Sequence, residues 1–334
     1  MKPKGYQYSY GPVPSRRLGK SMGINNIPGK VCTYSCVYCQ VGRTTKMQID
    51  RCSFYKPEDI FQDVQSRLIK TNMAKEQVDY LTFVPDGEPT LDVNLGREIT
   101  LLKALNVPIG VITNCSLLWR EDVREELGKA DWVSLKIDAV QEVIWRYINR
   151  PHKAISLSLI LDGILAFAKS FNGKLVTETM LVNGINDTDG CVIEIADFIQ
   201  RFEPSQAYLS IPTRPPAEKR VHSPNEKALN RAYQIFADRL NTVEYLIGYE
   251  GNAFAFTDDI EKDILNITTV HPMRKEAVDA ILSRAGCSWD IIDRMITRGV
   301  LTKAKYNEHI FYLSKYNKRS EVPFIVDPTR EGNK

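Results

Sequence analysis

The stretch GKVCTYSCVYCQ, residues 29–40, holds three of the seven cysteines of the chain. Cys32, Cys36 and Cys39 have the spacing Cys-x3-Cys-x2-Cys. A disulfide needs two thiols, and a closed zinc site usually takes four ligands. A [4Fe–4S] cluster also takes four ligands, so three cysteines leave one iron open for a small molecule. The stretch therefore predicts such a cluster, and the alternative is a zinc site that a distant residue such as Cys52 completes.

The composition indicates an ordinary globular protein. Of the 334 residues 43% are apolar and 25% charged, and the formal net charge is +3, too small to indicate nucleic-acid binding by the whole chain. Residues 1–12 lack the apolar core of a secretory signal, and no apolar run approaches the roughly 18–20 residues that span a bilayer. The other four cysteines are scattered singly, so we predict a cytoplasmic protein without a membrane partner.

Strand-like and helix-like segments alternate along most of the chain. Strands are expected at residues 21–27, 78–84, 108–113, 132–137, 174–182 and 206–212, and helices at residues 57–70, 94–105, 120–130, 154–171, 191–202 and 225–240. Such alternation is typical of a mostly parallel sheet with helices outside it. About six βα units are visible, whereas eight close a TIM barrel. We therefore predict an α/β fold, a partial (β/α)6 TIM-type barrel, with the cysteine loop at its C-terminal face.

The alternation stops after residues 243–256, and a different order follows. A helix over residues 273–284 and a second over residues 288–298 precede two strands around a polar turn. This is the order of a small winged helix-turn-helix domain. We predict a barrel domain at residues 1–257, a winged-helix-like domain at 258–320 and a C-terminal tail at 321–334.

The C-terminal segment is locally basic, because residues 264–320 hold 10 Lys or Arg against 5 Asp or Glu. Arg294 and Arg298 of its second helix suit phosphate contacts, which favours docking of a macromolecule. An alternative of another class is therefore an iron–sulfur regulator that binds DNA. Apolar residues such as Trp289 and Met295 nevertheless indicate that much of this helix is core.

Three further segments fall at predicted strand ends: VPDGEPT (84–90), VITNC (111–115) and SLKIDA (134–139). Together with the cysteine loop they resemble the radical S-adenosylmethionine (SAM) superfamily, over about residues 11–250. The resemblance implies that a [4Fe–4S] cluster binds SAM at its open iron, through the amino and carboxylate groups of SAM. It implies that one electron cleaves SAM to methionine and a 5′-deoxyadenosyl radical, which abstracts a hydrogen atom from the substrate. It also implies a reductant such as flavodoxin or ferredoxin.

The resemblance implies a role for each matching residue. The expected cluster ligands are Cys32, Cys36 and Cys39, and the expected SAM contacts are Tyr38, Gly87, Glu88, Asn114, Ser134, Lys136 and Asp138. Glu88 matches the acid of a Gly-Gly-Glu motif that contacts the SAM amino group, with Asp86 in place of the first glycine. The alternatives are a solvated Asp-Gly turn at this motif and a strand-end ion pair for Lys136.

Two other residues are candidate catalytic groups. Cys115 stands where the superfamily usually has glycine, and it is either a thiol hydrogen donor or a small packed residue. Arg214 follows the last predicted strand, and it either faces the site or has only a structural role outside it. Arg16 and Arg17 suit a carboxylate or a phosphate, or they tie the N-terminal segment to the barrel.

Residues 11–30 and the segments RPHK (150–153), MLVNGIND (180–187) and IPTRPP (211–216) resemble one subgroup, near the wyosine-type tRNA-modifying enzymes. Members of this subgroup mostly have no assigned substrate. The alternatives for the substrate are tRNA or another macromolecule, and a peptide or small molecule with a winged helix that docks a partner. We favour an enzyme over a regulator, because a regulator would not need polar residues at successive strand ends.

Overall fold

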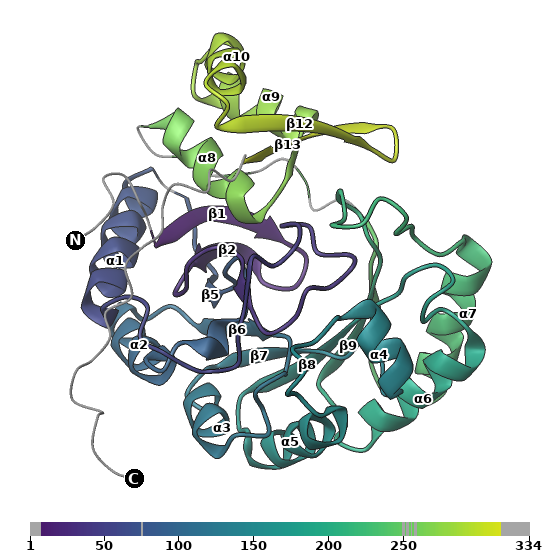
Figure 1. The fold of residues 1–334 in the computed structure, drawn as a ribbon. Coiled ribbons are helices and arrows are strands. Elements are labelled where there is room, and N and C mark those ends of the chain that lie inside the picture. Colours follow the sequence, from purple (N-terminus) through teal and green to yellow (C-terminus); the bar gives the residue numbers. More distant parts are fainter. Residues whose placement is uncertain are drawn as a thin grey trace.

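The main sheet has eight strands in the order β1–β2–β5–β6–β7–β8–β9–β10 (Figure 1). This computed structural model describes residues 8–314 except 75, 249, 250, 252, 253, 255, 257 and 258. The strands are β1 (Ser9–Ser15), β2 (Gly19–Ile24), β5 (Tyr80–Phe83), β6 (Ile109–Thr113), β7 (Trp132–Lys136), β8 (Lys174–Met180), β9 (Gln206–Ser210) and β10 (Val243–Leu246). β1 pairs with β2 antiparallel, and every other pair is parallel. The predicted α/β partial barrel is confirmed, with β1 as an additional edge strand.

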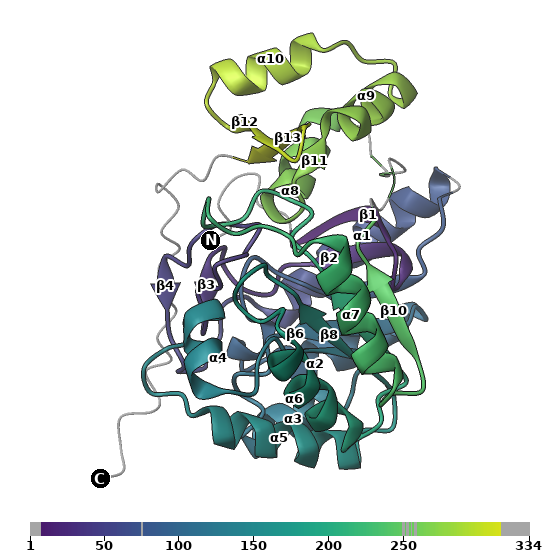
Figure 2. The ribbon, with the colours of Figure 1, turned by 90° about the vertical axis from the view of Figure 1, so that its right-hand side faces the viewer.

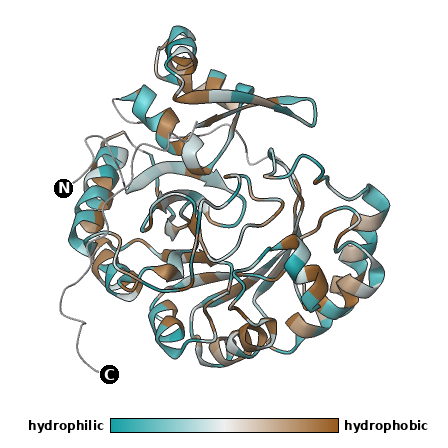
Figure 3. Ribbon diagram, viewed as in Figure 1, coloured by the Kyte–Doolittle hydropathy of each residue, from teal (hydrophilic) through white to brown (hydrophobic). Residues whose placement is uncertain are grey.

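Helices cover the outer face of the curved sheet (Figures 1 and 2). They are α1 (Pro57–Met73), α2 (Leu95–Leu102), α3 (Glu121–Leu127), α4 (Glu142–Ile148), α5 (Leu157–Ser170), α6 (Asp189–Gln200) and α7 (Glu226–Ala237), with short 3-10 turns η1 (Pro89–Leu91) and η2 (Lys103–Leu105). In α1, Pro57 occupies the first turn, where its missing N–H costs nothing, and Ile60 and Val64 are buried one turn apart. Figure 3 shows the resulting change from hydrophilic to hydrophobic residues around the outer helices.

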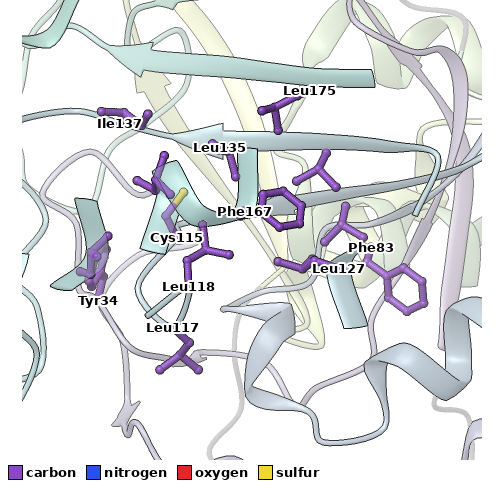
Figure 4. Packing of buried hydrophobic residues seen from close by; sticks show 14 of the residues in the cluster. Tyr34, Phe83, Cys115, Leu117, Leu118, Leu127, Leu135, Ile137, Phe167 and Leu175 are labelled. Atoms are coloured by element: carbon purple, nitrogen blue, oxygen red, sulfur yellow. The ribbon is translucent and has the colours of Figure 1, made fainter. Parts of the chain in front are cut away.

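The central strands are buried on both faces, as parallel strands under helices must be. Phe83, Leu135 and Phe167 lie in the main hydrophobic core without solvent exposure, and Figure 4 shows their side chains in that core together with Leu127. This packing fixes the positions of the strand ends, from which the loops of the site extend. Among the described residues, no helix has the length and apolar composition needed to cross a membrane.

A smaller unit of residues 260–314 packs against the β1 side of the barrel (Figure 2). Its elements are α8 (Ile260–Val270), β11 (Met273–Arg274), α9 (Lys275–Arg284), α10 (Asp290–Thr297), β12 (Leu301–Tyr306) and β13 (His309–Ser314), with a three-stranded sheet in the order β11–β13–β12. The expected order of two helices and a hairpin is observed, whereas α8 and β11 were not expected. The assignment as a winged helix stays a prediction.

This C-terminal unit shares a core with the barrel. Tyr10 and Val13 of β1 belong to the same buried cluster as Ile264 and Met295. A buried ion pair joins Arg67 of α1 to Asp263 of α8 at 3.1 Å. The predicted boundary between residues 257 and 258 and the predicted tail at 321–334 lie outside the described residues, so the domain limits stay predictions.

Candidate functional site at the C-terminal edge of the sheet

The cysteine loop follows β2 and contains a short parallel pair, β3 (Val31–Cys32) and β4 (Lys46–Met47). Cys32, Cys36 and Cys39 line one cavity of about 170 Å³. Burial raises the pKa of all three thiols, that of Cys36 to about 12. Among the described residues, no three His, Cys, Asp or Glu side chains converge as the ligands of a single metal ion do. The thiols of an iron–sulfur cluster instead bind separate iron atoms.

Two asparagine side chains donate hydrogen bonds to these sulfur atoms. The Nδ2 of Asn114 lies 3.5 Å from the Sγ of Cys32, and the Nδ2 of Asn149 lies 3.4 Å from the Sγ of Cys36. Donors of this kind stabilise negative charge on sulfur, which is the form that binds iron. Asn114 was expected at this site from the sequence, whereas Asn149 was missed, although it directly precedes the RPHK segment.

Glu88 joins the ends of β5 and β6. One of its carboxylate oxygens accepts hydrogen bonds from the N–H of Thr90 and from the hydroxyls of Thr90 and Thr113. The other oxygen accepts from the N–H of Asn114 at 2.8 Å. Burial raises the pKa of Glu88, and the hydrogen bonds from Thr113 and Thr90 oppose this shift. The carboxylate lines the thiol cavity, but most of its acceptor capacity is used within the protein.

Asp86 lines the same cavity and has a different environment. Its side chain is 4% exposed, and its Oδ1 is buried without a hydrogen-bond partner. Burial raises its pKa to about 8, with Lys30 opposing the shift. A buried carboxylate oxygen without a partner is costly, so the cavity fits a ligand with N–H donors, such as the amino group of SAM.

Gly87 allows the turn after β5 to approach the cysteine loop. A Cβ at this position would lie 1.8 Å from the carbonyl oxygen of Val31, and this oxygen accepts a hydrogen bond from the N–H of Glu88 at 3.3 Å. The clash is with backbone, so no side chain can move to relieve it.

Gly87→Ala is therefore expected to displace the turn and to lower both the iron content and the SAM affinity after anaerobic reconstitution. The matched control is Gly190→Ala in α6, where an added Cβ meets no atom within 4 Å. Iron analysis and equilibrium SAM binding measure both effects. A Gly87→Ala protein with a full cluster and unchanged SAM affinity would contradict the close approach.

Lys136, at the end of β7, lies between this cavity and a second one. Its Nζ is 3.0 Å from the Oε1 of Glu178, 3.8 Å from the Oδ1 of Asp138 and 5.3 Å from the ring centre of Tyr38. Burial lowers the pKa of Lys136, and Asp138 opposes this shift. The hydroxyl of Tyr38 donates to Asp138, which fixes the ring beside the cysteine loop. Ser134 is fully buried and lines neither cavity.

The second, interior cavity has a volume of about 230 Å³ and shares Cys39 and Lys136 with the first. Its lining also includes Arg16, Arg17, Tyr38, Gln40, Glu178, Ser210 and Arg214. Glu178 pairs with Arg17 and was missed by the sequence reasoning. The sequence does indicate a functional residue here, because Thr177, Glu178 and Thr179 interrupt an otherwise apolar strand.

Cys115 lies in the main hydrophobic core with 1% exposure, among the residues in Figure 4. Its backbone φ of 67° is in the left-handed region, which favours glycine and explains why the resembled motif has glycine here. Its Sγ lies 3.7 Å from the carbonyl oxygen of Thr113, and it lines neither cavity. The structure thus places Arg214 in the interior cavity and Cys115 outside it.

Comparisons with known proteins define the class. Residues 26–199 match the Radical SAM superfamily, and the chain belongs to that superfamily. Over 315 residues it is 47% identical to a UPF0026 protein of Methanocaldococcus jannaschii, covering 94% of this chain and 98% of that protein. A solved radical SAM methyltransferase from Sphaerobacter thermophilus shows the same fold, with a TM-score of 0.54 and 14% sequence identity. The match covers 68% of this chain and 66% of the methyltransferase chain.

Archaeal TYW1, a wyosine-type enzyme, also matches, with a TM-score of 0.46 and 15% sequence identity. This match covers 66% of this chain and 72% of the TYW1 chain. The superfamily predicted from the sequence is confirmed, and radical SAM enzymes bind SAM and a [4Fe–4S] cluster and need a reductant. The roles of single residues stay predictions.

Proposed function

We propose that this protein is a radical SAM enzyme that reductively cleaves SAM and abstracts a hydrogen atom from a substrate in the interior cavity. One observation carries the proposal: the three thiols, Asp86 and Lys136 line one cavity, and Lys136 also lines the interior cavity beside it. When bound, the cluster supplies one electron and SAM supplies the 5′-deoxyadenosyl radical. A DNA-binding regulator would have no use for a second polar cavity inside the barrel.

The chain's own residues hold and orient both groups in this proposal. Cys32, Cys36 and Cys39 hold the cluster, and Asn114 and Asn149 stabilise the charge on two of the sulfur atoms. The turn at Asp86, Gly87 and Glu88 and the end of β7 at Lys136 form the walls of the SAM site. The hydroxyl of Tyr38 donates to Asp138, which would hold the ring for contact with the adenine of SAM. Flavodoxin or ferredoxin would supply the electron.

The C-terminal unit lies near the cavity mouth, where Tyr306 of β12 donates to the carbonyl oxygen of Pro212 at 3.0 Å. Its basic surface is partly neutralised within the described residues, because Arg298 pairs with Glu261 and Lys305 pairs with Glu308. These pairs weaken the argument for a tRNA or RNA substrate. They favour the alternative with a peptide or small-molecule substrate, in which a winged helix at residues 258–320 docks a partner.

Reconstituted, reduced enzyme is expected to convert SAM to 5′-deoxyadenosine and methionine, slowly even without substrate. Chromatography with mass detection of 5′-deoxyadenosine measures this, with unreduced enzyme as the control. The proposal fails if enzyme with a complete cluster and bound SAM yields no 5′-deoxyadenosine above that control. Tight, specific DNA binding together with this result would support the regulator.

A further inference from the structure

We infer that Gln40 is a positioning residue for Cys39, because its side chain anchors the turn after this thiol to Arg214 and to the C-terminal unit. The inference rests on the proposed function, in which Cys39 is a ligand of the cluster. It also gives the C-terminal unit a direct part in holding the cluster site. Gln40 directly follows Cys39 in the sequence, and both residues line the interior cavity.

The amide of Gln40 contacts two separate parts of the structure. Its Oε1 accepts a hydrogen bond from the Nη1 of Arg214 at 2.7 Å, and its Nε2 donates to the carbonyl oxygen of Val270 at 2.8 Å. A guanidinium has no acceptor and a carbonyl oxygen has no donor, so a reversed amide would lose both bonds. The bond from the guanidinium is charge-assisted, which makes it roughly twice as strong as a neutral one. The side chain of Gln40 therefore has one favourable orientation.

Arg214 and the C-terminal unit also contact each other. Val270 is the last residue of α8, and the Nε2 of the next residue, His271, lies 3.0 Å from the Nη2 of Arg214. Because arginine has no acceptor, this nitrogen of His271 accepts. Val84, which lines both cavities, packs against the core that β1 shares with the C-terminal unit. The C-terminal unit is thus in contact with residues that line the site.

The turn that Gln40 anchors spans residues 39–42. The N–H of Gly42 donates to the carbonyl oxygen of Cys39 at 3.1 Å, and the φ of Gly42 is 86°, in the left-handed region. Burial raises the pKa of the Cys39 thiol, and hydrogen bonds from the backbone N–H groups of Val41 and Gly42 lower it. The next ion pair along the loop joins Arg43, whose side chain is 71% exposed, to Glu218. Exposed pairs contribute little, so the amide contacts described above do most of the positioning.

The position of this turn affects the electronic properties of the cluster in our proposal. Two asparagine side chains donate to the thiols of Cys32 and Cys36, and the backbone N–H groups after Cys39 donate to the third thiol. Hydrogen bonds to the sulfur atoms favour the more negative, reduced state of a cluster and so raise its reduction potential. Loss of the Gln40 contacts is therefore expected to loosen the turn and to make the potential more negative.

Gln40→Met tests the inference, because methionine fills a similar volume without making either hydrogen bond. The matched control is Gln48→Met in the same loop, since Gln48 lines neither cavity and donates to the carbonyl oxygen of Asp50. Hydrogen exchange of metal-free protein is the first measurement. We expect exchange at residues 41 and 42 to be about tenfold faster in Gln40→Met and unchanged in Gln48→Met.

The reduction potential of the reconstituted cluster is the second measurement, made by a redox titration monitored by electron paramagnetic resonance. It should be more negative in Gln40→Met and unchanged in Gln48→Met. A second control is Tyr306→Phe, which removes a contact between the C-terminal unit and Pro212 without touching the cysteine loop. Tyr306→Phe should also leave the potential unchanged. If Gln40→Met holds no cluster, Gln40→Asn supplies the potential, because its shorter side chain still reaches one partner.

Wild-type exchange or a wild-type potential in the Gln40 variants would overturn the inference, as would equal changes in Gln48→Met. An equal shift of the potential in Tyr306→Phe would show a general effect of the contact between the two units rather than a role of Gln40. If the wild-type protein binds no cluster, the proposed function fails. Hydrogen exchange of the metal-free protein still decides, in that case, whether Gln40 anchors the turn.

Discussion

Cys36→Ala is expected to abolish the iron–sulfur cluster, with iron and sulfide falling from about four each per chain to background. The Sγ of Cys36 lies in the same cavity as the thiols of Cys32 and Cys39, and Asn149 donates to it. Two thiolates from one loop cannot hold a cluster that already has one open iron. Anaerobic iron and sulfide analysis and the visible absorption of the reconstituted protein measure the loss.

Cys52→Ala is the matched control, and it also tests the zinc alternative. Cys52 lies outside the thiol cavity and contacts the Nε2 of Gln48 at 3.7 Å. If Cys52 completed a zinc site, its replacement would remove the metal as efficiently as Cys36→Ala does. We expect Cys52→Ala to keep a full complement of iron. Stoichiometric zinc in the wild-type protein, lost in both variants, would overturn the cluster assignment.

Much of the site follows from the sequence because parallel strands bring their C-terminal ends to one edge. The segments that contain Glu88, Asn114 and Lys136 were recognised separately, and the structure brings these three residues to the thiol cavity. Ser134 was also expected to contact SAM, but it is fully buried and lines neither cavity. A period of two residues gives the face of a strand on which a side chain lies, but not its depth below the site.

Other contacts depend on the closure of the barrel and could not be predicted from local patterns. Arg17 meets Glu178, and Gln40 meets Arg214, over separations of 161 and 174 residues. No periodicity relates positions so far apart. A polar residue within an apolar strand, such as Glu178, was nevertheless a usable signal, because burial of a carboxylate requires partners.

β1 and α8 are among the elements that were missed, and the reasons are local. β1 contains Gly11, Pro12 and Pro14, which are rare inside a sheet and tolerated here because β1 is an edge strand. α8 ends in the run Ile267 to Val270, where β-branched residues lower helix propensity. In α8 the burial of Ile260, Ile264 and Ile267 against the barrel outweighs this propensity.

Asp86→Ala is expected to weaken SAM binding by about 1.5–3 kcal/mol, which is tenfold or more. Asp86 lines the cavity of the three thiols, and its buried Oδ1 has no hydrogen-bond partner. In our proposal this oxygen accepts an N–H of the SAM amino group. Asp86→Asn keeps one acceptor and should lose less affinity. Alanine also resembles the glycine that the superfamily motif usually has here, so the variant should fold.

A SAM analogue without the amino group separates this contact from a general effect on the site. Asp86→Ala should leave the affinity for the analogue unchanged, because the analogue has no amino group to contact Asp86 even in the wild-type enzyme. Glu88→Gln should weaken the binding of SAM and of the analogue equally, because Glu88 positions Thr113 and Asn114 and does not contact one particular ligand group. Equilibrium binding to cluster-loaded enzyme gives all six affinities for wild type and the two variants. If Glu88→Gln alone discriminates between the ligands, Glu88 is the amino-group contact, as the Gly-Gly-Glu motif implies, and Asp86 is not.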